Sequence, residues 1–437
     1  MSKTNNMKAL NRIVLLLFCL AFVQCSTGTS PNVLPKPVIS GPAQVNQGDV
    51  STYSIPTTQN TLTWKVNDSI VGTTNPVMIT WKNAGTFKVT VTATDGKTSV
   101  VSDPYNVAVA ISLPSKPSIS TGGNPPVAGT SFSLQVSSIN ANQYTWYVNG
   151  TQVGKTSNLT FPYTFNKVGI DTVQVVASNN YGSTSSDKFP VRVDYNPSIT
   201  PTLAWSDEFN GTTLDMTKWG FDLGENGWGN NEWENYTNSN DSVSNGVLYI
   251  LAKLVGAGQH VGDYTSCRIN TAGKESFKYG QIEVRAKLPV GKGVWPAFWM
   301  LGSDIATNPW PACGEVDIME EVGYDQGNIH GSIHTPSSYG NTVNTSVKYL
   351  STCSSQYHIY GVIWTPVAIR FYIDDPTNIY YTYDPATKNA STWPFDNPCF
   401  IILNLAIGGN WGGVQGVDDS IFPQTYSIDY VRVYSYQ

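Results

Sequence analysis

The sequence predicts an all-β protein in which two small sandwiches precede one large β-sandwich domain. Short strand-like runs broken by Gly, Pro and Asn fill the C-terminal half, for example Gly280 to Leu288 and Phe400 to Ile407. We find no segment with apolar residues at helical spacing over three turns, as a buried helix face requires. A repeat of about 80 residues, the size of one small sandwich, precedes this half. The length of 437 residues also exceeds what one hydrophobic core usually serves.

Residues 1–25 are predicted to be an export signal. Basic side chains precede the apolar run Ile13 to Val23, which is too short to span a bilayer. Cys25 follows and resembles the lipid acceptor of bacterial lipoproteins, although Gln24 stands where such signals prefer a small residue. We expect an exported lipoprotein anchored in the outer membrane, at the cell surface or in the periplasm, with plain secretion as the alternative. Residues 26–34 form the tether.

Residues 35–111 and 112–196 are predicted to be two copies of one module. Trp64–Asn67 (WKVN) returns as Trp146–Asn149 (WYVN), and each copy then carries a strand with apolar and polar residues in alternation. In the first copy this strand is Phe87 to Ala93. The modules resemble immunoglobulin-like domains of the polycystic-kidney-disease type, without the disulfide of antibody domains. Their expected role is that of a spacer, and sugar binding is the alternative.

The composition is typical of an extracellular sugar-active protein. Charged residues make up 13% of the chain, against a usual share of about 25%, and aromatic residues make up 12%. Tryptophan and tyrosine rings stack well on sugar faces. The net charge of −6 contains no basic stripe, which argues against a nucleic-acid partner.

Cysteine and histidine usage limits the covalent chemistry of the C-terminal half. In an oxidising compartment its four cysteines allow up to two disulfides, in three connectivities. The sequence has no CxxC pair and its histidines are dispersed, which argues against zinc. The four cysteines are Cys267, Cys313, Cys353 and Cys399.

The segment Gly314–Gly323 (GEVDIMEEVG) concentrates acidic residues in a pattern that indicates chemistry. Glu315 and Asp317 are two apart and share one face of a strand. Glu320 would point to the opposite face in a regular strand, so we predict a β-bulge at Ile318-Met319 that returns it. Adjacent carboxylates repel one another, which favours a functional role. The alternative is a solvent-facing strand with scattered acids, and we expect Glu321 to be such an acid.

The chain from about Trp205 resembles glycoside hydrolase family 16, and within it the bacterial laminarinases (endo-β-1,3-glucanases). The resemblance includes the tryptophan motif Gly293–Leu301 (GVWPAFWML) and the acidic segment described above. Further matching motifs are Trp205–Gly211 (WSDEFNG), Asn230–Thr237 (NNEWENYT), Leu403–Trp411 (LNLAIGGNW) and Tyr426–Tyr434 (YSIDYVRVY). The resemblance implies a concanavalin-like β-jelly roll over residues 197–437, with a substrate cleft on its concave sheet.

The same resemblance implies the roles of individual residues. Glu315 matches the nucleophile and Glu320 the general acid/base, with Asp317 between them as the carboxylate that tunes their protonation. His334 and Trp299 match positions near the cleavage point. Further sugar-binding positions are Asn231, Arg268, Trp295 and Trp411.

The resemblance also implies a structural calcium ion on the convex face, while no cofactor is expected for catalysis. Its ligands would be Glu208, the main-chain carbonyl of Gly246, and Asp429. Oxygen-only ligands suit a hard cation, although turn and capping residues would look the same in a sequence. Two departures concern neighbouring sugar subsites: Glu321 stands where laminarinases often have an aromatic, and Thr335 replaces a frequent Gly.

Together these features predict an endo-acting, retaining β-glucanase that hydrolyses β-1,3-glucan by double displacement. A mixed-linkage β-1,3/1,4-glucanase, a transglycosylase and a non-catalytic carbohydrate-binding protein are the alternatives. A lectin would not need three converging acids. The expected partner is β-glucan polysaccharide, the expected state a monomer, and the membrane is approached through the lipid anchor alone.

Overall fold

The structure is a computed structural model that describes residues 34–56, 60–123 and 125–436. Regular structure in this part of the chain is almost entirely β, with two single-turn 3-10 helices, η1 (Gly323–Asp325) and η2 (Asp419–Ile421). The all-β prediction is therefore confirmed. No helix within the described ranges is long and apolar enough to cross a membrane. The predicted signal, Cys25 and most of the tether lie outside the described residues.

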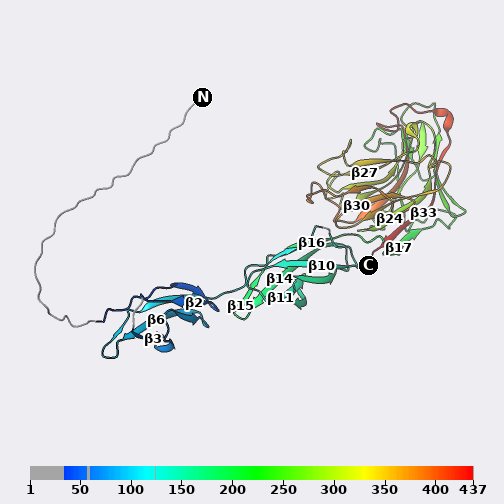
Figure 1. Ribbon diagram of the computed structural model, residues 1–437. Coiled ribbons are helices and arrows are strands. Elements are labelled where there is room, and N and C mark those ends of the chain that lie inside the picture. Colours follow the sequence, from blue (N-terminus) through cyan, green and yellow to red (C-terminus); the bar gives the residue numbers. More distant parts are fainter. Residues whose placement is uncertain (1–33, 57–59, 124, 437) are drawn as a thin grey trace, which may run out of the picture. The chain divides into compact units, whose positions relative to one another are not determined.

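The chain divides into two compact units after Ser112, and its described residues form three main hydrophobic cores. The core of the first unit is built around Trp64, which is fully buried. Trp64 packs in this core with the strand of alternating residues, Gly85–Thr94, that the sequence predicts. Its larger sheet joins β1 (Gln44–Asn46), β8 (Tyr105–Ala110), β6 (Gly85–Thr94), β3 (Thr61–Val66), β4 (Ser69–Gly72) and β7 (Ser99–Val101), and β2 (Val50–Tyr53) pairs with β5 (Val77–Thr80) (Figure 1).

The second unit begins with a small sandwich built around Trp146, the counterpart of Trp64. One sheet joins β13 (Thr160–Thr164), β10 (Ser131–Ser137) and β9 (Ser118–Ser120). The other joins β12 (Thr151–Thr156), β11 (Gln143–Val148), β14 (Gly169–Asn179), β15 (Gly182–Ser185) and β16 (Phe189–Val193). The immunoglobulin-like assignment of the two modules, and the exact domain boundaries, stay predictions.

The large C-terminal sandwich consists of two extended sheets. The ten-stranded sheet contains β17 (Thr202–Asp207), β19 (Glu234–Tyr236), β20 (Asp241–Ser244), β21 (Val247–Leu254), β22 (Tyr264–Ser266), β24 (Gly280–Lys287), β29 (His358–Trp364), β30 (Ile369–Ile373), β31 (Ile379–Tyr383) and β33 (Gln424–Ser435). The seven-stranded sheet has the order β18 (Gly220–Asp222), β23 (Arg268–Asn270), β32 (Cys399–Ile407), β25 (Val294–Gly302), β26 (Glu315–Glu320), β27 (Asn328–His334) and β28 (Thr345–Tyr349).

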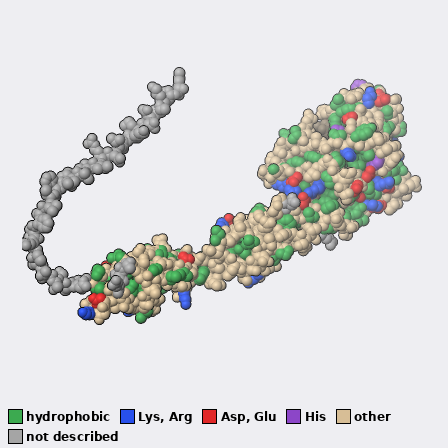
Figure 2. Space-filling view, viewed as in Figure 1, with side chains coloured by type: hydrophobic (Ala, Val, Ile, Leu, Met, Phe, Trp, Pro, Cys, Tyr) green, Lys and Arg blue, Asp and Glu red, His purple; other side chains and the backbone are tan. Residues whose placement is uncertain are grey.

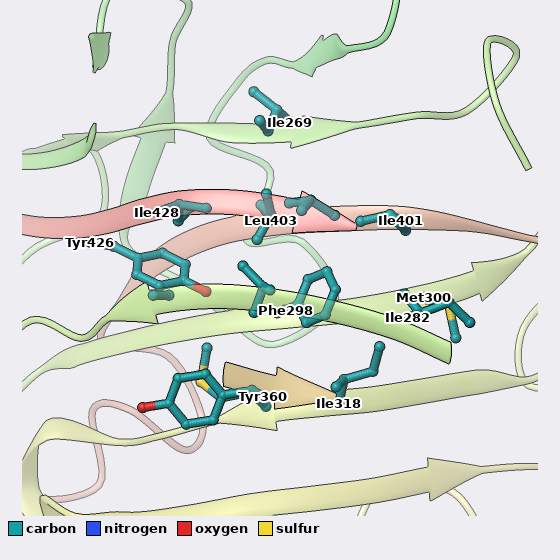
Figure 3. Packing of buried hydrophobic residues seen from close by; sticks show 14 of the residues in the cluster. Ile269, Ile282, Phe298, Met300, Ile318, Tyr360, Ile401, Leu403, Tyr426 and Ile428 are labelled. Carbon is teal, nitrogen blue, oxygen red and sulfur yellow. The ribbon is translucent and has the colours of Figure 1, made fainter. Parts of the chain in front are cut away.

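The two sheets enclose one apolar core, which fixes the outer face of each. Phe298, Ile318 and Leu403 of the seven-stranded sheet pack with Ile282 and Ile428 of the ten-stranded sheet (Figure 3). Alternate residues of the seven-stranded sheet therefore point outward and are free to line a cleft. On the face drawn in Figure 2, charged side chains are sparse among uncharged ones, in keeping with the composition.

Within the second unit, the end of β16 contacts the large sandwich through ion pairs. Arg192 Nη1 donates to Asp384 Oδ2 at 2.7 Å, and Arg370 Nη2 donates to Asp194 Oδ1 at 2.5 Å. These pairs connect the second module to strand β30 and to the loop that follows β31.

The disulfides that the sequence allowed do not form, because all four cysteines are buried free thiols. Cys313 and Cys399 lie on opposite sides of β25: Cys399 pairs with Gly302, whose N–H donates to Gly314 on the other side. Burial raises the pKa of the Cys313 thiol to about 11 and that of Cys353 to about 12. These thiols are therefore inert core residues.

Candidate active site

Strand β26 contains the bulge that the acidic spacing predicts. Glu315 lies opposite His334 of β27, and Glu320 lies opposite His330. A step of five residues on β26 thus spans four on its partner, with the register shift between Asp317 and Glu320. The predicted bulge is confirmed. The extra residue returns Glu320 to the outer face that Glu315 and Asp317 share.

The three carboxyl groups line one cleft of about 1050 Å³ on the outer face of the seven-stranded sheet. The floor of the cleft comes from β23, β32, β25, β26 and β27, so it crosses several strands. Most of its other lining side chains are aromatic rings, amides and hydroxyls. A polar cleft that crosses several strands and has aromatic walls suits an extended sugar chain.

Each carboxyl group has a distinct neighbour. Trp295 Nε1 donates to Glu320 Oε1 at 3.0 Å. His334 Nε2 lies 2.9 Å from Asp317 Oδ2, and Glu315 shares a hydrogen bond with Asp317. Asp317 is therefore the acid that contacts Glu315 directly, while Glu320 contacts Trp295.

Burial and mutual repulsion make the three acids retain protons. Burial, together with the charge of Asp317, raises the pKa of Glu315 to about 8. Burial raises the pKa of Asp317 to about 7. Burial and the Asp317 charge also raise the pKa of Glu320 well above its usual value. At neutral pH the cluster therefore holds protons on some of its members, and a proton within the Glu315–Asp317 hydrogen bond can reside on either oxygen.

Aromatic side chains form the walls on both sides of the acids. The Arg268 guanidinium lies between the rings of Trp228, at 4.8 Å, and Trp299, at 4.9 Å. Trp295 and Trp411 meet edge to face at 5.3 Å. The structure thus brings Arg268, Trp295, Trp299, His334 and Trp411 together with the carboxyl groups in one cleft.

Comparison with known proteins gives a consistent assignment for this domain. The model of the family Glycosyl hydrolases family 16 matches residues 228–432. The Beta-glucanase of Rhodothermus marinus is 40% identical over 277 residues, which cover 60% of this chain and 91% of that protein. The chain belongs to Glycosyl hydrolases family 16. It is a glycoside hydrolase.

Other members of the family are similarly close. The crystal structure of a laminarinase from Flavobacterium sp. UMI-01 is 48% identical with a TM-score of 0.51, and the match covers 54% of this chain and all of that one. The Glucan endo-1,3-beta-glucosidase A1 of Niallia circulans is 39% identical over 259 residues. That match covers 54% of this chain and 38% of the relative.

One predicted sugar-binding residue of this family 16 domain lies beside the cleft and not in its lining. The side chain of Asn231 donates to Asn410 Oδ1 at 2.9 Å, and it is the preceding residue, Asn230, that lines the cleft. Sequence reasoning also missed Trp228, Glu232, Trp310 and Asn404. A signal for Trp228 exists in the sequence, because it stands between Gly227 and Gly229 in a segment that needs left-handed backbone.

The prediction that Glu321 faces solvent is wrong. Its side chain is 0% exposed, and its Oε1 accepts hydrogen bonds from Gly327 N at 2.7 Å and Cys353 Sγ at 3.4 Å. Because the bulge directs Glu320 outward, the next residue turns into the interior between the sheets. Glu321 is not part of the cleft lining. Burial raises the pKa of Glu321 to about 7.

The predicted calcium residues of the family 16 domain share one pocket of about 490 Å³ on the ten-stranded sheet. A Cβ built on Gly246 would lie 3.7 Å from Asn210 Oδ1 and 3.9 Å from the Glu208 carbonyl oxygen, so oxygen atoms converge there. Both carboxylates are matched by cations. Arg432 binds Glu208 with two hydrogen bonds of 2.9 and 2.8 Å, and Arg285 pairs with Asp429.

The oxygen atoms of this pocket are of the type that binds calcium. The negative charges of its two carboxylates are already balanced by Arg432 and Arg285. The Arg432 pairing holds the pKa of Glu208 below its usual value. A calcium ion there would be held by main-chain and amide oxygens and by Asp429. Its binding would require Arg285 to release that carboxylate, because a divalent cation and a guanidinium repel each other.

Proposed function

We propose that this family 16 enzyme is an endo-acting, retaining β-glucanase that hydrolyses β-1,3-glucan. The observation that carries the proposal is the bulge of β26, which brings Glu315 and Glu320 onto one cleft face with Asp317 between them. The curated relatives named above support the substrate, since their names specify β-glucan or its 1,3-linkage. The β-1,3/1,4-glucans are the second candidate.

The proposed chemistry assigns one step to each carboxyl group. Ionised Glu315 attacks the anomeric carbon while Glu320 donates its proton to the departing glycosidic oxygen, which leaves a glycosyl ester on Glu315. Glu320 then accepts a proton from water, the hydroxyl attacks the anomeric carbon, and the ester bond breaks. Asp317 takes up the proton of the shared hydrogen bond, which leaves Glu315 ionised for its attack.

Endo cleavage follows from the extent of the cleft on both sides of the acids. Arg268 and Trp228 line one side, and Thr345 of β28 lines the other. A glucan chain can therefore lie across the sheet with sugar units on either side of the broken bond. A cleft of this kind does not require a chain end.

The proposal is tested by a reducing-sugar assay on laminarin, lichenan, barley glucan and agarose. We expect the highest kcat/KM on laminarin and a β-anomer as the first product in proton NMR. A preference for lichenan would make the enzyme a mixed-linkage glucanase, and transfer to added oligosaccharide in place of water would make it a transglycosylase. Binding without release of reducing ends would make it a lectin, and a first-formed α-anomer would contradict retention.

We further propose that calcium stabilises the domain at the Gly246 pocket. Binding to the folded state alone raises stability, by a few kcal/mol at about 100-fold excess over Kd. We expect calcium to raise Tm, Asp429→Ala to abolish the rise, and Arg285→Ala to strengthen it by freeing Asp429. Glu208→Ala should keep the response, because the Glu208 carboxylate is bound by Arg432. A Tm that is unchanged by chelator would contradict the proposal.

For the N-terminal part we propose export with lipid attachment at Cys25, and a spacer role for the two modules. The sequence of residues 1–25 supports the first point, and the location of every cleft-lining residue beyond the modules supports the second. Cys25→Ser should release the protein from the membrane fraction. Isolated modules that bind laminarin would contradict the spacer role.

A further inference from the structure

A second pair of buried acids lies at the edge of the cleft, apart from the three carboxyl groups of β26, and one of the two, Glu232, lines it. Glu232 is 3% exposed and Glu234, in β19, is 0% exposed. The two side chains share a hydrogen bond. Glu234 Oε2 also accepts the main-chain N–H of Ile407 at 2.6 Å, at the end of the cleft strand β32. The chemistry described above uses neither acid.

A chain of hydrogen bonds connects this pair to Trp299, one of the aromatic residues that line the cleft. Glu232 accepts from Asn230 Nδ2 at 3.0 Å and from the Tyr236 hydroxyl at 3.1 Å. The Tyr236 oxygen accepts from Asn404 Nδ2 at 3.0 Å, and Asn404 Oδ1 accepts from Trp299 Nε1 at 2.8 Å. Asn230, Glu232, Trp299 and Asn404 all line the cleft.

The donors around the pair decide which acid holds a proton. Burial raises the pKa of Glu232, but both of its oxygens accept hydrogen bonds and the Arg268 charge opposes this rise. Glu234 faces Glu232, Tyr236 and the Ile407 amide, and burial together with the Glu232 charge raises its pKa well above the usual value. Two ionised carboxylates in contact without water would be strongly unfavourable. Glu234 is therefore the neutral acid and donates to Glu232.

We propose that Glu234 is a positioning residue for glucan binding: as a neutral acid it holds Glu232, and through Tyr236 and Asn404 it fixes the Trp299 indole. The inference rests on the proposed function, because it concerns how the same cleft binds sugar. Loss of the Glu234 proton would leave two ionised carboxylates, Glu232 and Glu234, in repulsive contact. The repulsion would displace the hydrogen-bonded residues that position Trp299. Glucan binding should therefore weaken as the pH rises, independently of the catalytic carboxyl groups.

The variant Glu234→Gln distinguishes the effect of an ionisable proton from the effect of side-chain shape. Its amide nitrogen can donate to Glu232 and its oxygen can accept from Ile407 N, so both hydrogen bonds remain without a group that ionises. Leucine has a similar size and makes neither bond. Glu275→Gln, in an exposed turn, is the matched control for loss of one acid.

The experiment measures laminarihexaose binding by calorimetry from neutral to alkaline pH, in a Glu315→Gln background that prevents turnover. We expect Kd to rise about tenfold or more with pH in this background, a change of about 1.4 kcal/mol. The added Glu234→Gln should flatten that rise, Glu275→Gln should leave it, and Glu234→Leu should bind weakly at every pH. Titration of Asp317 and Glu320 affects all variants alike and cancels in the comparison.

The outcomes separate this inference from the proposed function. If wild-type enzyme hydrolyses laminarin but Glu234→Gln shows the same pH dependence of Kd as its parent, the positioning role is wrong. If wild-type enzyme neither binds nor cleaves laminarin, the proposed substrate is wrong instead. Because Glu234→Gln preserves both hydrogen bonds, it should fold, and near-ultraviolet circular dichroism verifies this even if Glu234→Leu does not fold.

Discussion

At the scale of single residues, the location of the protons among Glu315, Asp317 and Glu320 decides whether the cleft can react. The proposed mechanism needs an ionised Glu315 and a protonated Glu320. Burial raises the pKa of each acid, and the Asp317 charge raises the pKa of Glu315 and Glu320 further. The proposed reactive state therefore depends on how the three acids share their protons, and the Asp317 charge is one of the factors that decide this.

Removing the charge of Asp317 should shift the pH dependence of kcat in a defined direction. In Asp317→Asn the pKa of both Glu315 and Glu320 falls, because a neighbouring negative charge no longer favours their protonated forms. The alkaline limb, set by loss of the Glu320 proton, moves to lower pH, and kcat falls at least about tenfold. The exposed Asp375→Asn is the control. An alkaline limb that moves upward would contradict the electrostatic role of Asp317.

If Glu315 is the nucleophile and Glu320 the general acid, as proposed, removing each side chain should have a different chemical signature. Glu315→Ala should lower kcat by at least about 10⁴-fold, and added azide should restore a product of inverted configuration. Glu320→Ala should still form the glycosyl ester from activated aryl glycosides, since a good leaving group needs no proton. Burst kinetics and product NMR measure both effects. A reversed pattern of rescue would exchange the two roles.

At the scale of elements, the bulge of β26 assigns consecutive acids to opposite sides of the sheet. Glu320 faces the cleft, while Glu321 faces the interior and holds the turn before β27 through Gly327 N. One inserted residue thus places Glu320 in the cleft and Glu321 in the interior, where it binds the following turn. Burial of Glu321 destabilises the folded state when this carboxylate ionises, because an ionised group is poorly solvated in the interior.

Glu321 should make the stability of the domain depend on pH. Its folded-state pKa of about 7 lies above the ordinary value of 4.5, so its contribution is full below the ordinary value and declines as pH rises toward 7. Glu321→Gln removes this decline, which amounts to about 3 kcal/mol, and Glu321→Ala leaves Gly327 N unpaired and lowers Tm at all pH values. Thermal unfolding of the variants from acidic to neutral pH measures the effect. Parallel curves for wild type and Glu321→Gln would refute it.

At the scale of the whole molecule, the cleft that contains the three acids lies entirely in the C-terminal sandwich. Every cleft-lining residue lies at or beyond Trp228, whereas the second module contributes Arg192 and Asp194 to ion pairs away from the cleft. The modules and the catalytic sandwich also have separate hydrophobic cores. Stability and activity should therefore respond differently to removal of the modules.

A chain that begins at about residue 200 should keep its kcat/KM on soluble laminarin and unfold at a slightly lower temperature. The Tm decrease reflects loss of the Arg192–Asp384 and Asp194–Arg370 pairs, each worth about 1 kcal/mol when partly exposed. The double variant Arg192→Ala/Asp194→Ala of the full chain should reproduce it. Loss of most turnover in a folded truncated enzyme would show that the modules take part in catalysis.

Local sequence patterns were sufficient to predict the fold class and to predict that Glu315, Asp317 and Glu320 share one face. Two-residue alternation and frequent Gly, Pro and Asn predict strands wherever they occur, because a strand's pleat is a local property. The spacing of Glu315, Asp317 and Glu320 likewise requires a bulge if all three are to share a face, and the structure contains it. The tryptophan motifs identified most of the aromatic residues of the cleft.

Only the tertiary structure decided which groups each polar side chain contacts. Neighbouring strands decide that Glu321 lies in the interior and that Asn230, and not Asn231, lines the cleft. The same is true of the free, buried state of Cys313 and Cys399. The same holds for the link from Glu234 to Trp299 and for the arginines that occupy the calcium pocket. Such contacts join residues far apart in the chain, and the register of strand pairing that creates them is set by packing of the whole core.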